Sequence, residues 1–336
     1  MAKKALLVGA GAMGRAWAQN LKDCDDVELV AWVDILPGQA KRAAEDKGVQ
    51  PKYLGVSLED AIAATHPDFV VDVTIPEAHH DVTLFSLNHG LPVIGEKPMA
   101  TSMKEAQAMV AASEESGNLY MVSQSRRYDG RIHAYKRLIK KDLGHLGILN
   151  ADFYIGAHFG GFRDEMPSPL LLDMAIHTFD QARYLSGTDP VSVYCEEFNP
   201  SWSWYVGNAC ANVLFEMTNG VHFSFRGSWC SEGMHTSWDA DWRAIGEKGT
   251  ICWDGHANPT GEVVKSTDGF LSEFDQVTSP AEKIYSGIAG SLRDFLQTLE
   301  TGKAPQGECH DNIKSLAMVF AAVESAKQGR RIKVEW

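Results

Sequence analysis

A glycine-rich loop near the start of the chain constrains the fold more than any other feature. Gly9, Gly11 and Gly14 form the pattern G-x-G-x-x-G between an apolar run and an Ala-rich helical stretch. Gly9 allows a tight turn, Gly11 lets a pyrophosphate approach the backbone, and Gly14 lets the helix pack close to the strand. A second apolar run, Val27–Val33, leads into Asp34, 20 residues past Gly14. This spacing predicts a dinucleotide-binding βαβ unit.

The same alternation continues through the first 120 residues. Apolar runs rich in β-branched residues indicate strands buried on both faces, and the helical stretches between them indicate right-handed crossovers in a parallel sheet. The runs are Ala5–Val8, Val27–Val33, Phe69–Val73, Pro92–Ile94 and Leu119–Val122, and the helical stretches are Arg15–Leu21, Gln39–Lys47, Leu58–Ala64, His80–Asn88 and Met103–Glu115. Residues 1–122 are therefore predicted to form a doubly wound α/β domain of the Rossmann type.

The pattern changes after this point to a period of two. Val191–Tyr194, Ala211–Met217 and Val221–Gly227 alternate apolar and polar residues and are separated by turn signals. Two amphipathic helices, Ile284–Leu299 and Asp311–Lys327, are expected near the end of the chain. Residues 123–336 are predicted to form a second α/β domain whose mostly antiparallel sheet has one packed and one available face.

The charge balance argues against several classes of partner. Lys and Arg total 31 and Asp and Glu total 44, a net charge of −13, and so acidic a surface repels nucleic-acid backbones and anionic lipid. No apolar stretch reaches the ~18 residues that a membrane span needs. We therefore expect a cytoplasmic protein that binds neither nucleic acid nor membrane. The six cysteines lack the spacing of a zinc site, which favours reduced thiols and no bound metal.

Asp34 bears on which dinucleotide the loop would hold. A carboxylate at the end of the second strand can accept hydrogen bonds from both adenosine ribose hydroxyls and would repel a 2′-phosphate. No Arg follows it in Ile35–Gly38. This predicts NAD rather than NADP, although a turn or helix-cap aspartate is the plainer alternative.

Lys97, between Glu96 and Pro98, ends a predicted strand. Proline disfavours the helical conformation for the residue before it, so Lys97 is expected on a turn at the carboxyl edge of the sheet, where ligands bind in open α/β folds. Beside an oxidised nicotinamide, desolvation and the nearby positive charge would lower the pKa of the lysine toward that of a group that exchanges a proton with a hydroxyl. An ordinary solvated lysine is the alternative.

A second polar cluster lies on a helix predicted to begin after Ser168–Pro169, an N-cap followed by proline. Offsets of four and three place Asp173, His177 and Asp180 on one stripe of that helix. An acid–His–acid stripe suits either a histidine poised for proton transfer or a metal site. A helix-surface histidine with satisfied hydrogen bonds is the structural alternative.

Candidate substrate contacts are less specific. Arg127 follows the strand that ends at Val122 and could line a cleft or form a salt bridge. Tyr154 and His158 lie on one side of a presumed strand, Ala151–Ala157, and its continuation.

Tryptophans gather beyond residue 200. Trp202 and Trp204 are expected to share a strand face, with Trp229, Trp238 and Trp242 nearby in sequence. Aromatic residues on an open sheet more often pack a subunit interface than a sugar.

Several motifs in sequence order resemble those of the Gfo/Idh/MocA family (glucose–fructose oxidoreductase, inositol dehydrogenase and relatives). They are the Gly9–Gly14 loop, Thr74–His79, Glu96–Pro98, Asp173–Asp180 and Arg243–Thr250. The resemblance extends over nearly the whole chain, including the two closing helices. Members usually carry glycines around the helix aspartate, where this chain has Pro167–Leu172 and Ala175; this departure puts the size and shape of the substrate in question.

The resemblance implies an NAD(P)-dependent oxidoreductase whose second domain has a large open sheet that mediates homodimers or homotetramers. It implies that Lys97 hydrogen-bonds the reacting oxygen, that His177 is the acid or base, and that Asp173 orients His177 and binds substrate hydroxyls. The cofactor-binding residues expected are Gly9, Gly11, Ala12, Met13, Gly14, Asp34, Thr74, Pro76, His79 and Glu96. The substrate-binding residues expected are Lys97, Arg127, Tyr154, His158, Asp173 and His177.

We therefore predict an NAD-dependent oxidoreductase that transfers a hydride between nicotinamide and a hydroxyl carbon of a sugar, inositol or related polyol. Lys97 and His177 would handle the proton. One alternative is a non-catalytic protein on the same fold that senses NAD(H) or binds a small ligand, which would not need this acid/base pair. The other is a metal-dependent enzyme using Asp173, His177 and Asp180 with His79 or His80.

Overall fold

The computed structural model describes residues 2–336, which separate into two compact units. The first unit comprises the residues up to Ser125 together with Tyr285–Ile313, and the second comprises Arg126–Ile284 and Lys314–Trp336. The first boundary lies three residues beyond the predicted one. Residues 285–313 belong to the first unit rather than to the second, where the sequence pattern had assigned them.

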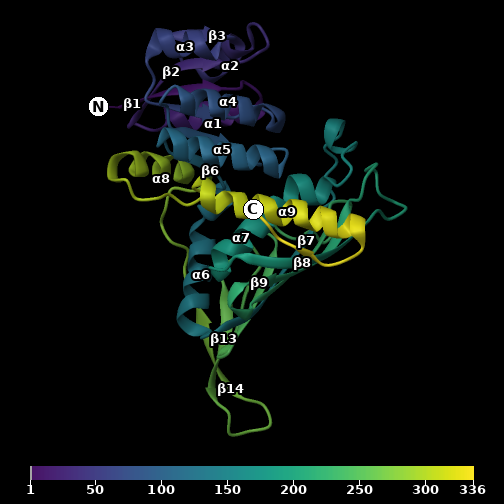
Figure 1. Ribbon diagram of the computed structural model, residues 1–336. Coiled ribbons are helices and arrows are strands. Elements are labelled where there is room, and N and C mark those ends of the chain that lie inside the picture. Colours follow the sequence, from purple (N-terminus) through teal and green to yellow (C-terminus); the bar gives the residue numbers. More distant parts are fainter. Residues whose placement is uncertain (1) are drawn as a thin grey trace. The chain divides into compact units, whose positions relative to one another are not determined.

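Within residues 2–336, the first unit contains a six-stranded parallel sheet in the order β3-β2-β1-β4-β5-β6 (Figure 1). This is the strand order of the Rossmann fold, so the predicted fold of this half is confirmed. The strands are β1 (Lys3–Val8), β2 (Val27–Val33), β3 (Tyr53–Gly55), β4 (Phe69–Asp72), β5 (Val93–Glu96) and β6 (Tyr120–Ser123). The crossover helices are α1 (Ala12–Lys22), α2 (Gln39–Lys47), α3 (Leu58–Thr65), α4 (Pro76–Asn88) and α5 (Met103–Ser116).

One late helix also covers the first unit. Helix α8 (Gly287–Thr301) places Phe295 against Phe69 of β4, with ring centroids 5.3 Å apart. The chain then returns to the sheet, where Glu308 forms an isolated bridge with Met121 of β6. Residues 285–313 therefore bury their apolar side against the first sheet, although they are remote from it in sequence.

The second unit is built on a larger sheet. Among the described residues it has nine strands in the order β14-β13-β12-β11-β7-β10-β9-β8-β15. Strands β7 and β10 run parallel and the other neighbours run antiparallel, so the predicted mostly antiparallel sheet is confirmed. The strands are β7 (Leu146–Tyr154), β8 (Pro190–Phe198), β9 (Cys210–Met217), β10 (His222–Ser228), β11 (Asp241–Gly246), β12 (Gly249–Trp253), β13 (Thr260–Ser266), β14 (Glu273–Thr278) and β15 (Ile332–Lys333).

Two helices lie wholly within this unit, and a third lies partly in it. They are α6 (Gly130–Asp142), α7 (Ile176–Ser186) and α9 (Cys309–Gln328), whose first residues, up to Ile313, belong to the first unit. A π-helical turn, Leu170–Ala175, precedes α7. Short 3₁₀ turns cover Ser125–Arg127, Gly161–Arg163 and Thr218–Gly220.

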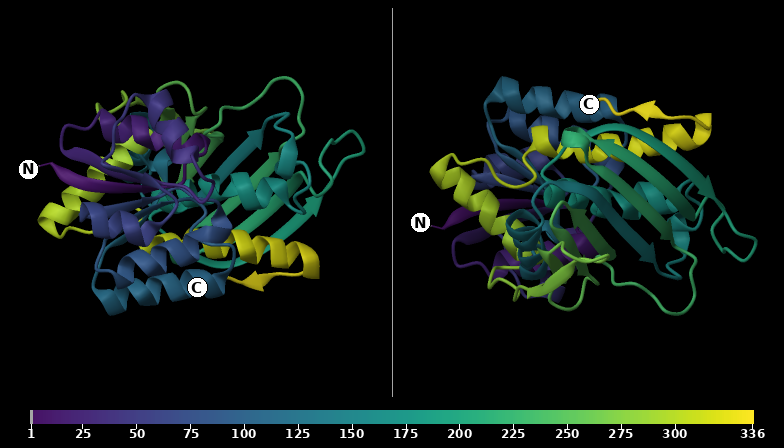
Figure 2. Two further views of the ribbon diagram at one scale, coloured as in Figure 1. Left: turned by 90° about the horizontal axis from the view of Figure 1, so that it is seen from above. Right: turned by 90° about the horizontal axis from the view of Figure 1, so that it is seen from below.

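The two faces of the large sheet differ in character, as the alternation predicted. Phe179 of α7 packs edge-on against Phe215, Phe223 and Phe225 of the sheet, with ring centroids 4.9–6.1 Å apart. The opposite face carries polar side chains and a hollow of about 720 Å³. Both views of Figure 2 show these strands side by side as one continuous layer.

Trp202 and Trp204 do not share a strand face, contrary to expectation. Trp202 lies exposed in a turn, because the segment between β8 and β9 is a loop rather than a strand. Trp204 stacks on His158, with ring centroids 3.8 Å apart. Trp229 and Trp242 are buried in the core, so they cannot form a subunit interface.

None of the helices in residues 2–336 has the length and apolar character needed to cross a membrane.

Candidate active site

The glycine loop follows β1 and has the geometry that a dinucleotide needs. Gly9 has a φ of +100°, and a Cβ there would lie 2.7 Å from the Val73 carbonyl oxygen. A Cβ on Gly14 would lie 2.2 Å from the Gly9 carbonyl oxygen. By contrast, no protein atom lies within 4 Å of the Cβ position of Gly11. Gly9 and Gly14 accept only glycine because a Cβ at either position would collide with backbone atoms of this unit, whereas Gly11 borders open space.

The N-terminus of α1 faces this loop without a protein anion of its own. No side chain caps it, and the first turn, which begins with Ala12 and Met13, contains no acid. The free N–H groups and the helix dipole favour a phosphate at such a terminus. The residues present therefore fit the diphosphate of a dinucleotide.

Asp34 follows β2 and is fixed by the same loop. Its Oδ2 accepts a hydrogen bond from the Ala10 N–H over 2.7 Å, and its Oδ1 accepts one from the Leu36 N–H over 2.9 Å. A carboxylate has about four acceptor sites, so Asp34 can still accept from two ribose hydroxyls. The turn-aspartate alternative and the cofactor role are thus compatible.

Arg42 is a basic residue near Asp34 that lies outside the segment Ile35–Gly38 considered in the sequence. Helix α2 returns Arg42 to the turn after Asp34, where its Nη1 lies 3.3 Å from the Cβ position of Gly38. The Arg42 Nη2 donates to the Gln39 side chain over 2.9 Å. This guanidinium is close enough in sequence and space to bear on cofactor choice.

Glu96 and Lys97 lie where β5 ends. Glu96 is buried, and its Oε1 accepts a hydrogen bond from the Trp17 indole N–H over 2.8 Å. Its Oε2 accepts one from the Lys97 backbone N–H over 3.2 Å. Burial raises the pKa of Glu96 above its usual value, although Trp17 and Lys97 act in the opposite direction. Lys97 occupies a bend, as predicted, and its peptide bond to Pro98 is cis.

The turn from β4 into α4 is held by a buried carboxylate. Asp72 accepts hydrogen bonds from the Thr74 hydroxyl over 2.6 Å and pairs with His79 Nδ1 at 2.9 Å. Burial alone would lower the pKa of His79, but the Asp72 carboxylate raises it above the usual value. Pro76 starts α4. Thr74 and His79 therefore have a definite structural role, and their expected contact with cofactor stays a prediction.

These features share one edge of the first sheet. The carboxyl ends of β1, β2, β4 and β5 carry the glycine loop, Asp34, the Asp72–His79 turn and the Glu96–Lys97 turn. In parallel sheets this edge is where ligands bind. Sequence inspection missed Trp17 and Asp72. Trp17 contacts Glu96, which is 79 positions away in the sequence, and Asp72 contacts His79, which is seven positions away.

The second unit carries the other predicted catalytic residues on one helical segment. Asp173 lies in the π-helical turn and His177 in the first turn of α7, and both are partly exposed. π-helical turns occur often at functional sites. Arg163 holds Asp173 by a hydrogen bond from its Nε to Oδ2 over 2.6 Å.

Arg163 was not among the predicted site residues. It comes from the 3₁₀ turn Gly161–Arg163, and its guanidinium lies over the rings of Phe159 and Phe162 at 5.0 and 4.7 Å. A basic residue ten positions before Asp173, beside two glycines, is the signal that sequence reasoning could have used. The pair positions Asp173 at the start of the helical segment.

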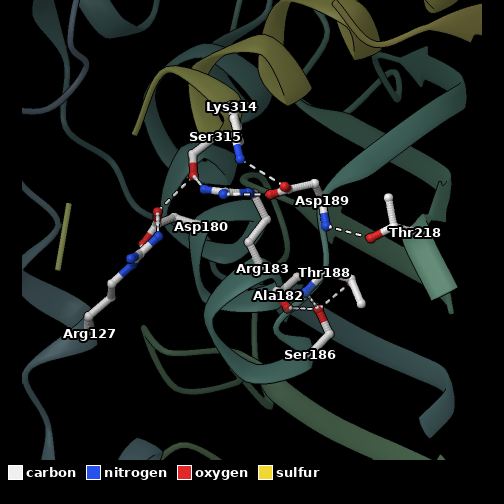
Figure 3. A network of polar contacts seen from close by, with 10 residues as sticks. All are labelled: Arg127, Asp180, Ala182, Arg183, Ser186, Thr188, Asp189, Thr218, Lys314 and Ser315. Carbon is white, nitrogen blue, oxygen red and sulfur yellow. Dashed lines mark hydrogen bonds and ion pairs between the residues drawn. The ribbon is translucent and has the colours of Figure 1, made fainter. Parts of the chain in front are cut away.

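Asp180 does not share the exposed stripe with Asp173 and His177, so the predicted three-residue stripe is wrong at this position. Both Asp180 oxygens accept hydrogen bonds from Arg127, over 2.6 and 2.7 Å, and both side chains are buried (Figure 3). The salt-bridge alternative for Arg127 is therefore correct, and its predicted substrate contact is not supported. Asp180 is also unavailable as a metal ligand.

Figure 3 shows how this pair extends into a network around α7. The Ser315 hydroxyl donates to Asp180, and Arg183 links Ser315 to Asp189. Lys314 donates to the other Asp189 oxygen over 2.8 Å. Burial would raise the pKa of Asp189, but Lys314 and Arg183 lower it below its usual value. The network fixes the helix that carries His177.

Two other predicted substrate residues, Tyr154 and His158, lie at and just after the end of β7. Tyr154 aligns with Ser228 of β10 and lies two residues after Asp152, which places it on the sheet face opposite the one that packs on α7. The regular alternation of β7 to its end fixes this face for Tyr154, and its expected contact with substrate stays a prediction. His158 pairs with Glu232 at 2.7 Å and stacks on Trp204, and it is mostly exposed.

Two models of one oxidoreductase family match this chain. The first, described as an oxidoreductase family with an NAD-binding Rossmann fold, matches residues 3–124, and the Gfo/Idh/MocA C-terminal domain matches residues 104–252. Similar proteins include inositol 2-dehydrogenase of Rhizobium meliloti, 26% identical over 98% of each chain. D-apiose dehydrogenase of Paraburkholderia graminis is 24% identical over 99% of this chain and 90% of that protein.

The fold likeness is equally extensive. The crystal structure of an oxidoreductase from Agrobacterium radiobacter in complex with NAD⁺, L-tartaric acid and magnesium superposes with a TM-score of 0.87. It covers 99% of both chains at 23% identity. Because the two family models together span residues 3–252, and their order matches the two units described above, the chain belongs to the Gfo/Idh/MocA family of NAD-binding oxidoreductases.

Proposed function

We propose that this protein is a cytoplasmic NAD-dependent dehydrogenase of a sugar, inositol or related polyol. The observation that carries the proposal is the carboxyl edge of the first sheet. There an uncapped helix N-terminus, the Asp34 carboxylate and the Glu96–Lys97 turn occur together. The names of the relatives, inositol 2-dehydrogenase and D-apiose dehydrogenase, support this substrate class.

The residues of the first unit would bind and orient the cofactor. The glycine loop and the N-terminus of α1 would hold the diphosphate, and Asp34 the adenosine ribose. Thr74, Pro76, His79 and Glu96 would border the nicotinamide end. When bound, NAD supplies hydride acceptance and donation, which the protein side chains cannot.

The side chains would handle the proton. In this proposal Lys97 hydrogen-bonds the reacting oxygen, and His177 takes up or returns the hydroxyl proton. Asp173 would accept hydrogen bonds from substrate hydroxyls, and Arg163 keeps its carboxylate in place. That Lys97 and His177 act on the same substrate stays a prediction.

Reduction of NAD on a panel of inositols, aldoses and polyols, followed by NADH absorbance, tests this function. Lys97→Ala and His177→Ala should each lower turnover by roughly 10²–10⁴-fold, the usual contribution of general acid–base catalysis. His145→Ala, at an exposed histidine of the same unit with no predicted role, is the matched control. Near wild-type turnover in both catalytic variants would refute the assignment, and NAD binding without any reduction would favour the sensor alternative.

Cofactor choice needs a separate measurement. Asp34 favours NAD, whereas Arg42 beside the same turn could bind a 2′-phosphate. We expect a lower KM for NAD than for NADP in the wild-type protein. A lower KM for NADP would contradict the role given to Asp34.

We further propose that the open face of the large sheet forms a homodimer or homotetramer interface. Asp152 and Arg226 pair on this face, with Asn150 and Ser224 beside them. Arg226→Glu would place like charges against Asp152 and should shift the mass measured by light scattering toward the monomer. An unchanged mass in this variant would exclude this part of the face from the interface.

A further inference from the structure

Three consecutive residues at the start of α9 bring three different donor atoms together. Glu308 Oε1, Cys309 Sγ and His310 Nδ1 lie within 4.8 Å of one another. The carboxylate oxygen is 2.7 Å from the imidazole nitrogen and 2.9 Å from the sulfur, and the sulfur is 3.5 Å from the nitrogen. All three residues belong to the first unit.

The fold holds these side chains from two sides. Glu308 is tied to Met121 of β6 by a backbone bridge, and its carbonyl accepts the Asn312 N–H of the first turn of α9. The Cys309 side chain is completely buried. His310 is half-exposed and Glu308 is partly exposed, so solvent reaches the cluster at these two side chains.

A fourth residue orients the imidazole. His310 Nε2 lies 2.9 Å from Oε1 of Glu114, which lies near the end of α5. A histidine that binds a metal through one nitrogen almost always donates its other N–H to a carboxylate or carbonyl, which fixes the ring orientation. Glu114 occupies that position relative to His310.

We propose that Glu308, Cys309 and His310 bind a divalent transition-metal ion, with zinc the best match. Thiolate, imidazole and carboxylate are the donors that zinc takes in tetrahedral sites, at bond lengths of about 2.3 Å to sulfur and about 2.0–2.2 Å to nitrogen and oxygen. Tetrahedral angles then separate sulfur from nitrogen by about 3.5 Å and nitrogen from oxygen by about 3.3 Å. The Sγ–Nδ1 distance already has this value, and the Glu308 oxygen, 2.7 Å from Nδ1 and 2.9 Å from Sγ, would lie roughly 0.6–0.7 Å farther from each of them. Water would supply the fourth ligand from the exposed side.

Charge also fits a divalent ion. Binding breaks the S–H bond of Cys309 and releases its proton to solvent, so that the thiolate and the Glu308 carboxylate together neutralise two positive charges. The neutral imidazole adds no charge. This cluster differs from the Asp173–His177 segment because it contains a thiol and because it belongs to the first unit rather than the second.

The position of the cluster indicates a structural ion. Helix α5 runs from the carboxyl end of β5 back to the start of β6, so Glu114 lies toward the amino edge of the sheet, away from the glycine loop. An ion here would join the end of α5 to the start of α9. Sequence spacing missed the set because its ligands are neighbours in the chain rather than spaced as in zinc motifs.

Cobalt binding tests the proposal directly. Full-length protein freed of metal with a chelator should bind one Co²⁺ per chain and develop the near-ultraviolet absorption of a cobalt–thiolate bond, which Zn²⁺ then removes. Cys309→Ser should abolish this band, and Glu114→Gln should weaken affinity by about 10–100-fold. Cys24→Ser, at another buried cysteine of the first unit, is the matched control and should leave the band unchanged.

Two results would overturn the proposal. One is no cobalt–thiolate band in the wild-type protein at a few equivalents of Co²⁺, which would leave the cluster as a helix-terminal ion-pair network only. The other is a band that persists in Cys309→Ser. If that variant does not fold, His310→Gln serves instead: Zn²⁺ should raise the Tm of the metal-free wild-type protein but not that of His310→Gln. An equal rise in both also refutes the site.

Discussion

Replacing Trp17 with phenylalanine tests whether the Glu96 carboxylate beside Lys97 is held charged inside the first unit. The Trp17 side chain is fully buried, and its indole N–H donates to Glu96 over 2.8 Å. Burial raises the pKa of Glu96, and the Trp17 hydrogen bond is the largest of the influences that lower it. Removing that N–H should therefore raise the pKa of Glu96 further.

The sign and size of the effect on stability follow from this contact. A carboxyl group whose pKa is raised by folding contributes its full stability below its usual pKa of 4.5 and loses it as pH rises through the folded value. A hydrogen bond to a charged group contributes about 1.5–3 kcal/mol, and a neutral one about 0.5–1.5 kcal/mol. Trp17→Phe should therefore destabilise the protein more at neutral pH than near pH 4.5.

Trp32→Phe is the matched control. Trp32 is equally buried, but its indole N–H donates over 2.8 Å to the Gly9 carbonyl, which has no charge to titrate. Both variants lose the same ring volume, so the difference between their Tm values reports the hydrogen bond to the Glu96 carboxylate. Thermal unfolding of the NAD-free proteins, followed by circular dichroism from about pH 4.5 to about pH 8, measures it. A Tm difference between the two variants that stays constant over this range would refute a charged Glu96.

Three further predictions concern the loop, the buried pair and Arg163. Gly11→Ala should raise the KM for NAD by about tenfold or more with an unchanged Tm, because its Cβ enters open space beside the helix terminus, whereas Gly14→Ala should lower the Tm sharply; equal Tm losses would contradict this. Asp180→Ala should cost about 3–5 kcal/mol in urea unfolding, because it removes the carboxylate that forms two hydrogen bonds with the buried Arg127 guanidinium; a loss below about 1 kcal/mol would show that the pair is solvated. Arg163→Met should change stability by less than about 1 kcal/mol but lower kcat/KM by up to about 10²-fold through a displaced Asp173, with partial recovery in Arg163→Lys; full activity in Arg163→Met would remove this role.

The sequence predicted the first unit well because its signals are local. Helix α2 and strand β2 have the predicted bounds, and the glycine pattern, the second strand and Asp34 all lie within 26 residues of one another. Strand β3 was missed because three residues are too few to show a period. Residues 285–313 were misassigned because an amphipathic pattern shows that a helix packs on something, but it does not show which of the two sheets the helix packs on.

The site in the second unit was harder to predict because its partners are distant in sequence. Asp180 pairs with Arg127, 53 positions away, and helical periodicity alone could not separate its buried face from that of His177. A period of 3.6 also fails across the π-helical turn, which shifts Asp173 relative to the residues that follow. Alternation also gives the two faces of β7 without saying which of them packs on a helix, so the sequence did not predict on which face Tyr154 lies.

The same turn explains how the chain dispenses with the glycines usual before the helix aspartate. Leu170 and Leu171 are completely buried in the stretch where family members usually carry glycines. The room for them comes from glycines elsewhere: a Cβ on Gly227 of β10 would lie 3.0 Å from the Leu170 side chain, and one on Gly207 would lie 2.2 Å from the Pro167 carbonyl. The large side chains of the helical segment are thus accommodated because the neighbouring backbone carries glycines at Gly227 and Gly207. Asp173 keeps its place because Arg163, rather than a flexible glycine segment, holds its carboxylate. It follows that replacing Leu170 with glycine would open a cavity beside Gly227 instead of restoring the family's usual geometry.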